Sequence, residues 1–453
     1  MYTELFFDDY RLLGRAGTTR DYGKPECIAE YFDPDYSTDY FSPWVFRRGE
    51  DFFMLYLGQQ RSLGTMALLA ARSEDGVHFQ PLLCGSSNVL MELSPGEEPA
   101  CIVEDVFAPT KERYKMIMTK HYKERFHVRA CVYASPDLLS WTVFLDEIPN
   151  WGCEPVGGAF YNAHRQCYTI LRRPTWGNRC TGYSDTKDFK SFTPYELCLH
   201  QDALDRPLDE IYGMSAFAYA GMYIGFPLLY TDNPPSRKTK YTSGSIVPQL
   251  GYSWDGHHFL RSLRKSFLPD YAGKEMLLWL STALEQKDGS LLLYCAMSPE
   301  GHGAAFASHQ NGRIRIYRLR KDSFIALNSE ADEATVTTRE YLYEGGPISV
   351  NLCAEHATMA LIDTSGEHPA SQAWGTDESA PGFDHSDCVP FSGDSTCWHP
   401  VFAGGSYEKF KGRVLIMEIK YTNGSLYSVS GSLRPLTNTQ SARYRGLGVI
   451  SEY

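Results

Sequence analysis

The segment 151–161, Trp-Gly-Cys-Glu-Pro-Val-Gly-Gly-Ala-Phe-Tyr, carries the side chain with the clearest chemical potential. Its Glu154 stands between Cys153 and Pro155, at the start of an expected strand. The neighbouring glycines would let a ligand or a second backbone come close. A carboxylate in such a place can give or take a proton, so we interpret Glu154 as a catalytic acid. The alternative is a glutamate that begins an exposed strand.

The elements that must position this group are β-strands. Four segments share a tail in which a Ser is followed by an Asp and then an aromatic residue; they begin at Ser73, Ser135, Ser184 and Ser253. Each tail follows an aromatic strand, and a fifth such strand spans 290–295. We expect each Asp to centre a tight turn into an outer strand, with the aromatic residue packed between sheets. Five such units predict a five-bladed β-propeller.

A different β pattern follows the repeats, with strands expected from residue 336 to residue 429. We therefore predict an all-β chain with three parts. Residues 1–325 form the propeller, residues 326–433 form a C-terminal β-sandwich, and residues 434–453 form a polar tail.

Composition narrows the class of protein. The net charge of −12 leaves no basic surface for a nucleic acid, so no nucleic-acid partner is expected. No apolar run reaches the length of about 18 residues that a membrane span needs, and no signal peptide opens the chain. Neither the twelve Cys nor the His residues show metal-binding spacing, so neither a metal nor another cofactor is expected. Scattered thiols predict a cytoplasmic protein. Whether the chain forms a homo-oligomer stays open at this point.

With these features in place, the chain resembles the five-bladed-propeller glycoside hydrolases, the group of families 32, 43, 62 and 68. It looks closest to family-32-like proteins, which also carry a C-terminal β-sandwich. The segments 5–10, 112–116 and 318–324 are similar to recurring segments of these proteins.

The resemblance implies three catalytic carboxylates, one from the first strand of each of the first three blades. The matching residues are Asp39, Asp105 and Glu154. Asp39 would be the nucleophile or base, Asp105 the transition-state stabiliser, and Glu154 the general acid of a hydrolysis that needs two carboxylates across the scissile bond. The chain departs from the family 32 pattern, because no Pro follows Asp105 and the Cys precedes Glu154.

Several other side chains could contact a sugar. Asp209 and Glu210 precede a strand and could bind hydroxyls or act as a further acid. Arg172, with Arg173 beside it, could pair with these acids or hold an anionic substituent. His302 follows the fifth aromatic strand and could reach the same cavity. Three tryptophans could stack on a sugar ring, although core packing is the more common role: Trp44, Trp151 and Trp176.

The sequence thus predicts a glycoside hydrolase of the fructofuranosidase or arabinofuranosidase kind, acting on a small carbohydrate. Two alternatives stay open at this point. One is a glycoside phosphorylase such as those of family 130, which share this propeller and would need basic residues for phosphate. The other is a carbohydrate-binding propeller without catalysis, in which the acids would not converge.

Overall fold

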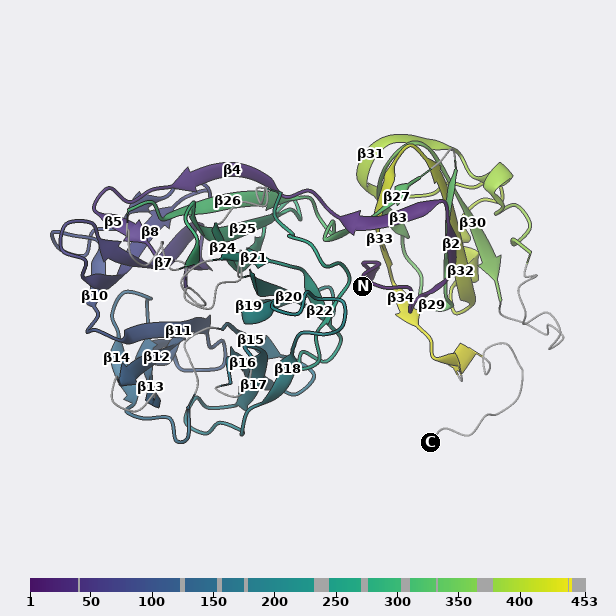
Figure 1. Ribbon diagram of the computed structural model, residues 1–453. Helices are drawn as coiled ribbons and strands as arrows, with labels where there is room; N and C mark the ends of the chain where they lie inside the picture. The colour runs from purple at the N-terminus through teal and green to yellow at the C-terminus, as the bar shows by residue number, and fades with distance from the viewer. Residues whose placement is uncertain are drawn as a thin grey trace. The chain divides into compact units, whose positions relative to one another are not determined.

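The computed structural model of the chain is all-β, as the sequence predicts (Figure 1). It describes residues 1–39, 41–122, 127–152, 157–174, 178–231, 244–269, 276–302, 310–330, 333–364, 378–438 and 440–441. The chain divides into two compact units, 24–320 and a second unit made of 1–23 with 321–453. The first unit is therefore shorter than the expected residues 1–325, because residues 1–23 and 321–325 belong to the second unit.

The unit 24–320 is built from antiparallel four-stranded runs, which we number one to five. Run one contains β5 (Tyr36–Thr38), β6 (Trp44–Arg48), β7 (Asp51–Gln60), β8 (Met66–Ser73), β9 (Gln80–Pro81) and β10 (Val89–Glu92), with β5 and β6 sharing one edge and β9 and β10 the other. Run two is β11 (Glu97–Glu104), β12 (Tyr114–Tyr122), β13 (His127–Ser135) and β14 (Thr142–Leu145). Run three is β15 (Ala159–Asn162), β16 (Cys167–Arg172), β17 (Thr181–Thr186) and β18 (Glu196–Leu199).

The remaining two runs are joined into one sheet by a single parallel bridge, between Ile246 and Leu277. Run four is β19 (Glu210–Tyr219), β20 (Met222–Thr231), β22 (Gly251–Ser253) and β23 (Leu260–Arg261), with β21 (Ser245–Pro248) beside β22 on β20. Run five is β24 (Leu277–Glu285), β25 (Leu291–Ser298), β26 (Arg313–Leu319) and β4 (Glu26–Tyr31). Because β4 comes from the start of this unit, run five takes its last strand from the other end of the sequence, which ties the two ends together.

The predicted Ser–Asp turns are present after Ser73, Ser135 and Ser253. In run three the prediction at Ser184 and Asp185 is wrong by two residues, because both lie within β17 and the turn is formed by Thr186 and Asp188.

In the first turn, the Ser73 hydroxyl donates to the Asp75 carboxylate over 2.8 Å and accepts the Gly76 N–H over 3.0 Å. The aromatic residue that follows, Phe79, is buried and contacts Tyr294 of run five edge to face, with ring centroids 6.0 Å apart. The repeat therefore places an aromatic side chain between neighbouring runs, as expected from the sequence.

The second unit is one hydrogen-bonded sheet of eleven strands. Its main path is β2 (Leu12–Ala16), β28 (Ala334–Thr338), β32 (Val414–Thr422), β30 (Ser349–Asp363), β33 (Ser425–Gly431), β27 (Ile325–Ser329) and β3 (Thr18–Tyr22). The other members are β1 (Tyr2–Glu4), β29 (Tyr341–Tyr343), β31 (Phe391–Trp398) and β34 (Leu433–Pro435). Three strands come from residues 1–23, which explains why that segment belongs here. Most of the predicted tail lies outside the described residues.

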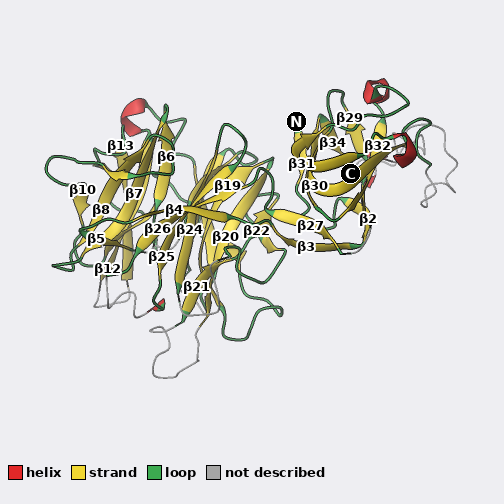
Figure 2. Cartoon of the chain, turned by 90° about the horizontal axis from the view of Figure 1, so that it is seen from above, coloured by secondary structure: helices red, strands yellow, loops and turns green. Residues whose placement is uncertain are grey.

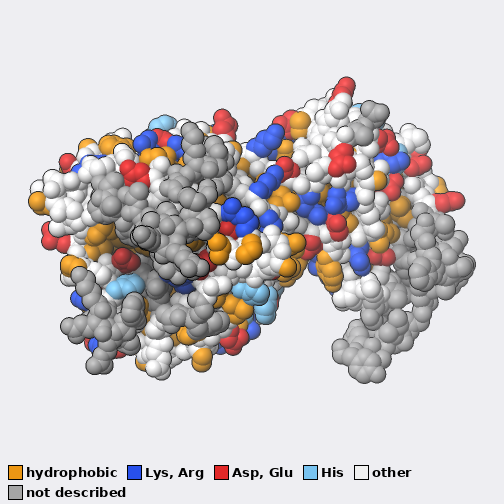
Figure 3. Space-filling view, in the orientation of Figure 1, with side chains coloured by type: hydrophobic (Ala, Val, Ile, Leu, Met, Phe, Trp, Pro, Cys, Tyr) orange, Lys and Arg blue, Asp and Glu red, His pale blue; other side chains and the backbone are white. Residues whose placement is uncertain are grey.

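Among the described residues, helical structure is limited to residue 302, residues 438, 440 and 441, and three short 3₁₀ turns drawn in red in Figure 2: Thr110–Glu112, His385–Asp387 and Tyr407–Phe410. Within the described ranges, no helix has the length and apolar character needed to cross a membrane. On the face drawn in Figure 3, acidic and basic side chains are interspersed with apolar ones over the described surface.

Candidate active site

The first strands of all five runs border one cavity of about 140 Å³. They are β6, β11, β15, β19 and β24, and they contribute among others Trp44, Val103, Ala159, Ala216 and Thr282. We call this space the central cavity; on β11 it is lined by the last three residues, Ile102–Glu104, and neither Glu98 nor Asp39 belongs to its lining.

Two glycines before β15 permit the close packing that this arrangement needs. A Cβ on Gly157 would lie 1.8 Å from the carbonyl oxygen of Leu171, and a Cβ on Gly158 would lie 3.0 Å from the Cα of Ser215. Only glycine fits at the first position, so the expectation that these residues allow a close backbone approach is confirmed.

Glu98, the second residue of β11, is the most perturbed carboxyl group at the starts of these strands. Burial, and then the negative charge of Asp39, raise the pKa of Glu98 to about 7, while the positive charge of Arg173 opposes both effects. Among the described residues, none donates a hydrogen bond to the Glu98 carboxylate. A carboxyl group in this state holds a proton near neutral pH and can donate it.

Asp39, the neighbour of Glu98, directly follows β5 and is held by its own loop. Its carboxylate accepts the backbone N–H of Phe41 over 3.1 Å, and its backbone N–H donates to the carbonyl of Leu57 on β7 over 2.9 Å. The Ser42 hydroxyl donates to the Asp39 carbonyl over 3.0 Å. These contacts fix the position of the acid that acts on Glu98.

Arg173 joins this acid pair to run four. It directly follows β16, and its guanidinium donates to the carbonyl of Tyr212 over 3.3 Å and lies 4.7 Å from the centre of the Tyr212 ring. Burial, and then the charge of Arg173, lower the pKa of His121 on β12. Tyr212 sits at a bulge in β19, and β11 has a bulge just after Glu98. Such bulges re-aim side chains next to functional sites.

Tyr212 leads to a second layer of polar contacts. Its hydroxyl and the His302 Nε2 are 2.9 Å apart, and both residues are buried. Arg179 lies 5.2 Å from the centre of the Tyr212 ring and 5.3 Å from that of Tyr230, and it forms an ion pair with Glu210. The structure therefore brings Glu210 and His302 toward the same cluster as Arg173. The Glu210 carboxylate is already engaged by a guanidinium.

Asp105 does not lie with the other acids. It follows the last residue of β11, seven residues after Glu98, which is about 20 Å along a strand. Its carboxylate contacts the ammonium of Lys115 at 3.3 Å and accepts a hydrogen bond from the Tyr168 hydroxyl at 3.0 Å. Because Lys115 is only 2 % exposed, Asp105 balances a buried charge. These contacts favour a structural role for Asp105, and its membership of the catalytic set stays a prediction.

Two of the predicted sugar contacts form part of the core. The Arg172 guanidinium lies 3.8 Å from the centre of the Trp151 ring and donates to the Ser184 hydroxyl over 2.9 Å. Trp151 is 2 % exposed, so it offers no face to a sugar. Arg172 and Arg173 are adjacent on an extended backbone, and adjacent side chains point to opposite faces, which explains why only Arg173 joins the acid pair.

The other predicted residues divide between the cavity and the framework. Trp44 is buried within the apolar core and also borders the central cavity. The Asp209 carboxylate is held by Arg206 at 3.0 Å and accepts a hydrogen bond from the Thr231 hydroxyl at 2.8 Å, so its contacts are internal. Glu154 and Trp176 lie outside the described residues. Within the described ranges, no group of three or more His, Cys, Asp or Glu side chains could hold a metal ion.

Glu98 is the residue that the sequence reasoning missed. A signal for it was present, because Glu98 is followed by Pro99 and stands at the start of its strand, as Glu154 precedes Pro155 and a strand. The family resemblance instead matched Asp105, which lies at the other end of β11.

Comparison with known proteins gives structural matches only. No protein-family model and no curated protein matches the chain. A glycosyl hydrolase from Bacteroides ovatus is 16% identical with a TM-score of 0.45, and the match covers 65% of this chain and 94% of that one. A thermostable family-43 glycoside hydrolase is 10% identical with a TM-score of 0.45, covering 68% and 96%.

A beta-1,2-mannobiose phosphorylase from Listeria innocua is 12% identical with a TM-score of 0.43, and the match covers 62% of this chain and 89% of that one. The structural neighbours thus include glycoside hydrolases and phosphorylases, as the resemblance stated from the sequence implies. At these identities and TM-scores, the function has to be argued from the residues of the chain itself.

Proposed function

We propose that the chain is a glycoside hydrolase that cleaves a small oligosaccharide or glycoside at the acid pair formed by Glu98 and Asp39. In this proposal the five runs are the blades of a five-bladed β-propeller, and the eleven-stranded sheet folds as a β-sandwich. The observation that supports catalysis best is the pair formed by Glu98 and Asp39, in which one carboxyl group holds a proton near neutral pH beside a second, negatively charged one. Glycoside hydrolysis needs this division of roles.

The roles follow from the two environments. Glu98 donates its proton to the oxygen of the leaving group, because its pKa of about 7 keeps much of it protonated at neutral pH. Asp39 attacks the anomeric carbon or activates a water molecule for that attack. Arg173 positions Glu98 and limits the rise of its pKa. The sequence predicts Glu154 as the proton donor, and Glu154 stays a third candidate carboxylate for the reaction.

Leaving-group dependence separates these roles. Loss of the proton donor slows the release of a poor leaving group, such as a sugar alcohol, far more than that of nitrophenolate, which needs little protonation. We expect Glu98→Gln to slow the release of a sugar alcohol far more than that of nitrophenolate. Asp39→Asn should slow turnover of both kinds of substrate by a factor of about 10³ or more. If Glu154→Gln shows the leaving-group dependence and Glu98→Gln does not, the donor is Glu154. Full activity in Asp39→Asn and Glu98→Gln would refute the proposed site.

A glycoside phosphorylase is the second candidate, because cationic groups border the acid pair. Arg173, Arg179 and His121 could hold an anion. However, Arg179 is paired with Glu210, and Arg173 faces the acid pair, so the described charges do not leave a net positive site. Hydrolysis therefore remains the first candidate. Turnover of nitrophenyl glycosides and of fructo-, arabino- and manno-oligosaccharides, measured with and without phosphate, distinguishes the two reactions.

A further inference from the structure

A second and larger cavity, of about 770 Å³, opens at one end of run three. It is bordered by the β15–β16 connection and by the turn that follows β17, and none of its lining residues borders the central cavity. Its lining includes Arg165, Asp185, Lys187, Asp188, Phe192 and Thr193. We call it the run-three cavity.

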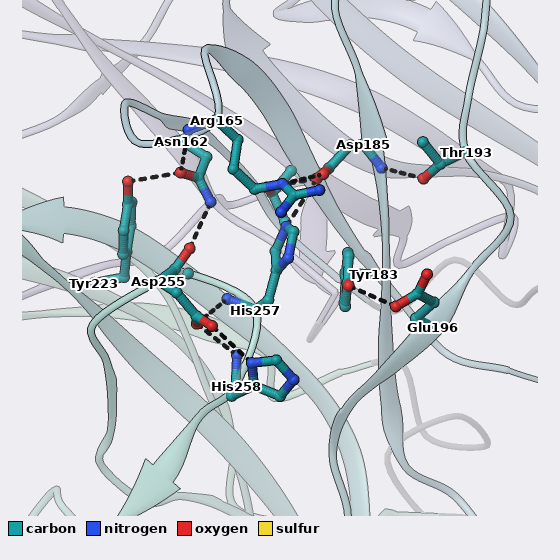
Figure 4. A network of polar contacts seen from close by, with 12 residues as sticks. Asn162, Arg165, Tyr183, Asp185, Thr193, Glu196, Tyr223, Asp255, His257 and His258 are labelled. Carbon is teal, nitrogen blue, oxygen red and sulfur yellow. Dashed lines mark hydrogen bonds and ion pairs between the residues drawn. The ribbon is translucent and has the colours of Figure 1, made fainter. Parts of the chain in front are cut away.

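A buried carboxylate anchors one wall of this cavity. Asp185 accepts hydrogen bonds from the Thr169 hydroxyl at 2.8 Å and from the Arg165 Nε at 3.1 Å, and the His257 Nε2 lies 3.2 Å from it (Figure 4). Burial by itself raises the pKa of Asp185, but these contacts outweigh burial and lower it. The ring of His257 is in turn stacked on Tyr183, with centroids 3.8 Å apart. The carboxylate is thus fully engaged and fixed.

The anchored partner, Arg165, keeps most of its hydrogen-bonding capacity. Its side chain is 56% exposed, and among the described residues only its Nε is used, by Asp185. The guanidinium is therefore oriented by one edge, while its two terminal nitrogens remain available. A guanidinium held in this way is a preorganised fork for a carboxylate or phosphate group.

The rest of the lining suits an organic ligand more than a bare ion. Lys187 is exposed and adds a second cation. The Asp188 carboxylate accepts the backbone N–H groups of Lys190 and Ser191, both at 2.8 Å, so part of its charge is satisfied by its own turn. Phe192 supplies a half-buried aromatic wall. An apolar wall, hydroxyl groups and an oriented guanidinium together match an amphiphilic molecule that carries one anionic group.

We propose that the run-three cavity binds an anionic saccharide, whose carboxylate or phosphate group pairs with Arg165 and Lys187 while a sugar face packs on Phe192. The positive and negative formal charges of the lining are close to equal. Recognition of the anion therefore depends on the orientation of the Arg165 guanidinium and not on a strong net positive potential. The site lies outside the central cavity, and its existence does not depend on the reaction proposed at the acid pair.

Equilibrium binding by the full-length chain tests this proposal. The probes are tri-galacturonate, glucose 6-phosphate, an uncharged trisaccharide and inorganic phosphate. The chain should bind at least one of the first two, and the preference between them identifies a uronate or a sugar phosphate as the source of the anion. Arg165→Gln should weaken that binding at least tenfold. Arg129→Gln is the matched control, because it removes the same charge from an exposed ion pair on β13 and should leave binding unchanged.

Four results would overturn the proposal. They are no binding of either charged saccharide by the unmodified chain, equal binding of the uncharged trisaccharide, binding of inorganic phosphate alone, and unchanged affinity in Arg165→Gln. Asp39→Asn separates the run-three cavity from the proposed active site, because binding at the run-three cavity must persist in this variant. Binding that is lost in Asp39→Asn and kept in Arg165→Gln belongs to the proposed active site and also contradicts the proposal.

Discussion

Replacing Glu98 by Gln should stabilise the protein at pH 8 far more than at pH 5. Burial and the charge of Asp39 raise the pKa of Glu98 from 4.5 to about 7 in the folded chain. Below pH 4.5 the group is neutral in both the folded and the unfolded chain, so it costs nothing. Above that value the unfolded chain ionises first, and the folded chain loses stability until the pH exceeds about 7.

The size of the effect follows from the same two values. A change from 4.5 to about 7 corresponds to about 3.4 kcal/mol of unfolding free energy, at about 1.4 kcal/mol for each pKa unit. Because Glu98 is only half-buried, solvent screening reduces this figure, and we expect Glu98→Gln to gain about 2 kcal/mol at pH 8. At pH 5 most of the cost has not yet appeared, so the expected gain is below about 1 kcal/mol.

Urea unfolding at the two pH values measures this difference, and Glu97→Gln is a matched control one residue away. Burial alone would raise the pKa of Glu97, but hydrogen bonds from Lys120 and Ser94 lower it. The same substitution there should therefore be neutral or destabilising at pH 8. If Glu98→Gln shifts the unfolding free energy equally at both pH values, or destabilises the chain at pH 8, Glu98 does not carry the raised pKa on which the proposed mechanism depends.

Two further substitutions test residues placed in the framework. Asp105→Asn should lower the free energy of unfolding in urea by about 3 kcal/mol, because it leaves the buried Lys115 charge without its carboxylate partner. Turnover by the molecules that remain folded should be unchanged. Loss of turnover in a stable variant would place Asp105 in the catalytic set. Asp75→Ala should lower the free energy of unfolding by about 1 kcal/mol near neutral pH, because hydrogen bonds from the turn backbone and from His78 outweigh burial and lower the pKa of Asp75. The loss should become smaller as the pH falls below about 4, where the carboxylate is protonated. An equal loss at all pH values would contradict this prediction.

The local features of the fold could be predicted from the sequence because they depend on neighbouring residues. The Ser–Asp turns depend on hydrogen bonds between residues two or three positions apart. The aromatic residue after each turn then packs on one side of its sheet. The membership of residues 1–23 in the second unit could not be predicted this way. It depends on pairing between strands more than 300 residues apart, such as Leu12 with Thr338.

The catalytic candidates were predicted only in part, for a reason that lies in strand direction. β11 has acids at both ends, Glu97 and Glu98 at the start and Glu104 and Asp105 at the end. Which end meets the acids of the other runs depends on how the first strands are oriented around the cavity, and a single sequence does not show that orientation. Asp39 precedes β6 and Glu154 precedes β15, which favours the start of the strand and hence Glu98.

The interaction between Asp39 and Glu98 is the central claim, and a direct titration tests it. The pH dependence of the Glu98 carboxyl ¹³C signal, assigned by comparison with Glu98→Gln, should have its midpoint near 7 in the unmodified chain and a lower midpoint in Asp39→Asn. A midpoint near the ordinary value of 4.5, or one that Asp39→Asn does not move, would contradict the account.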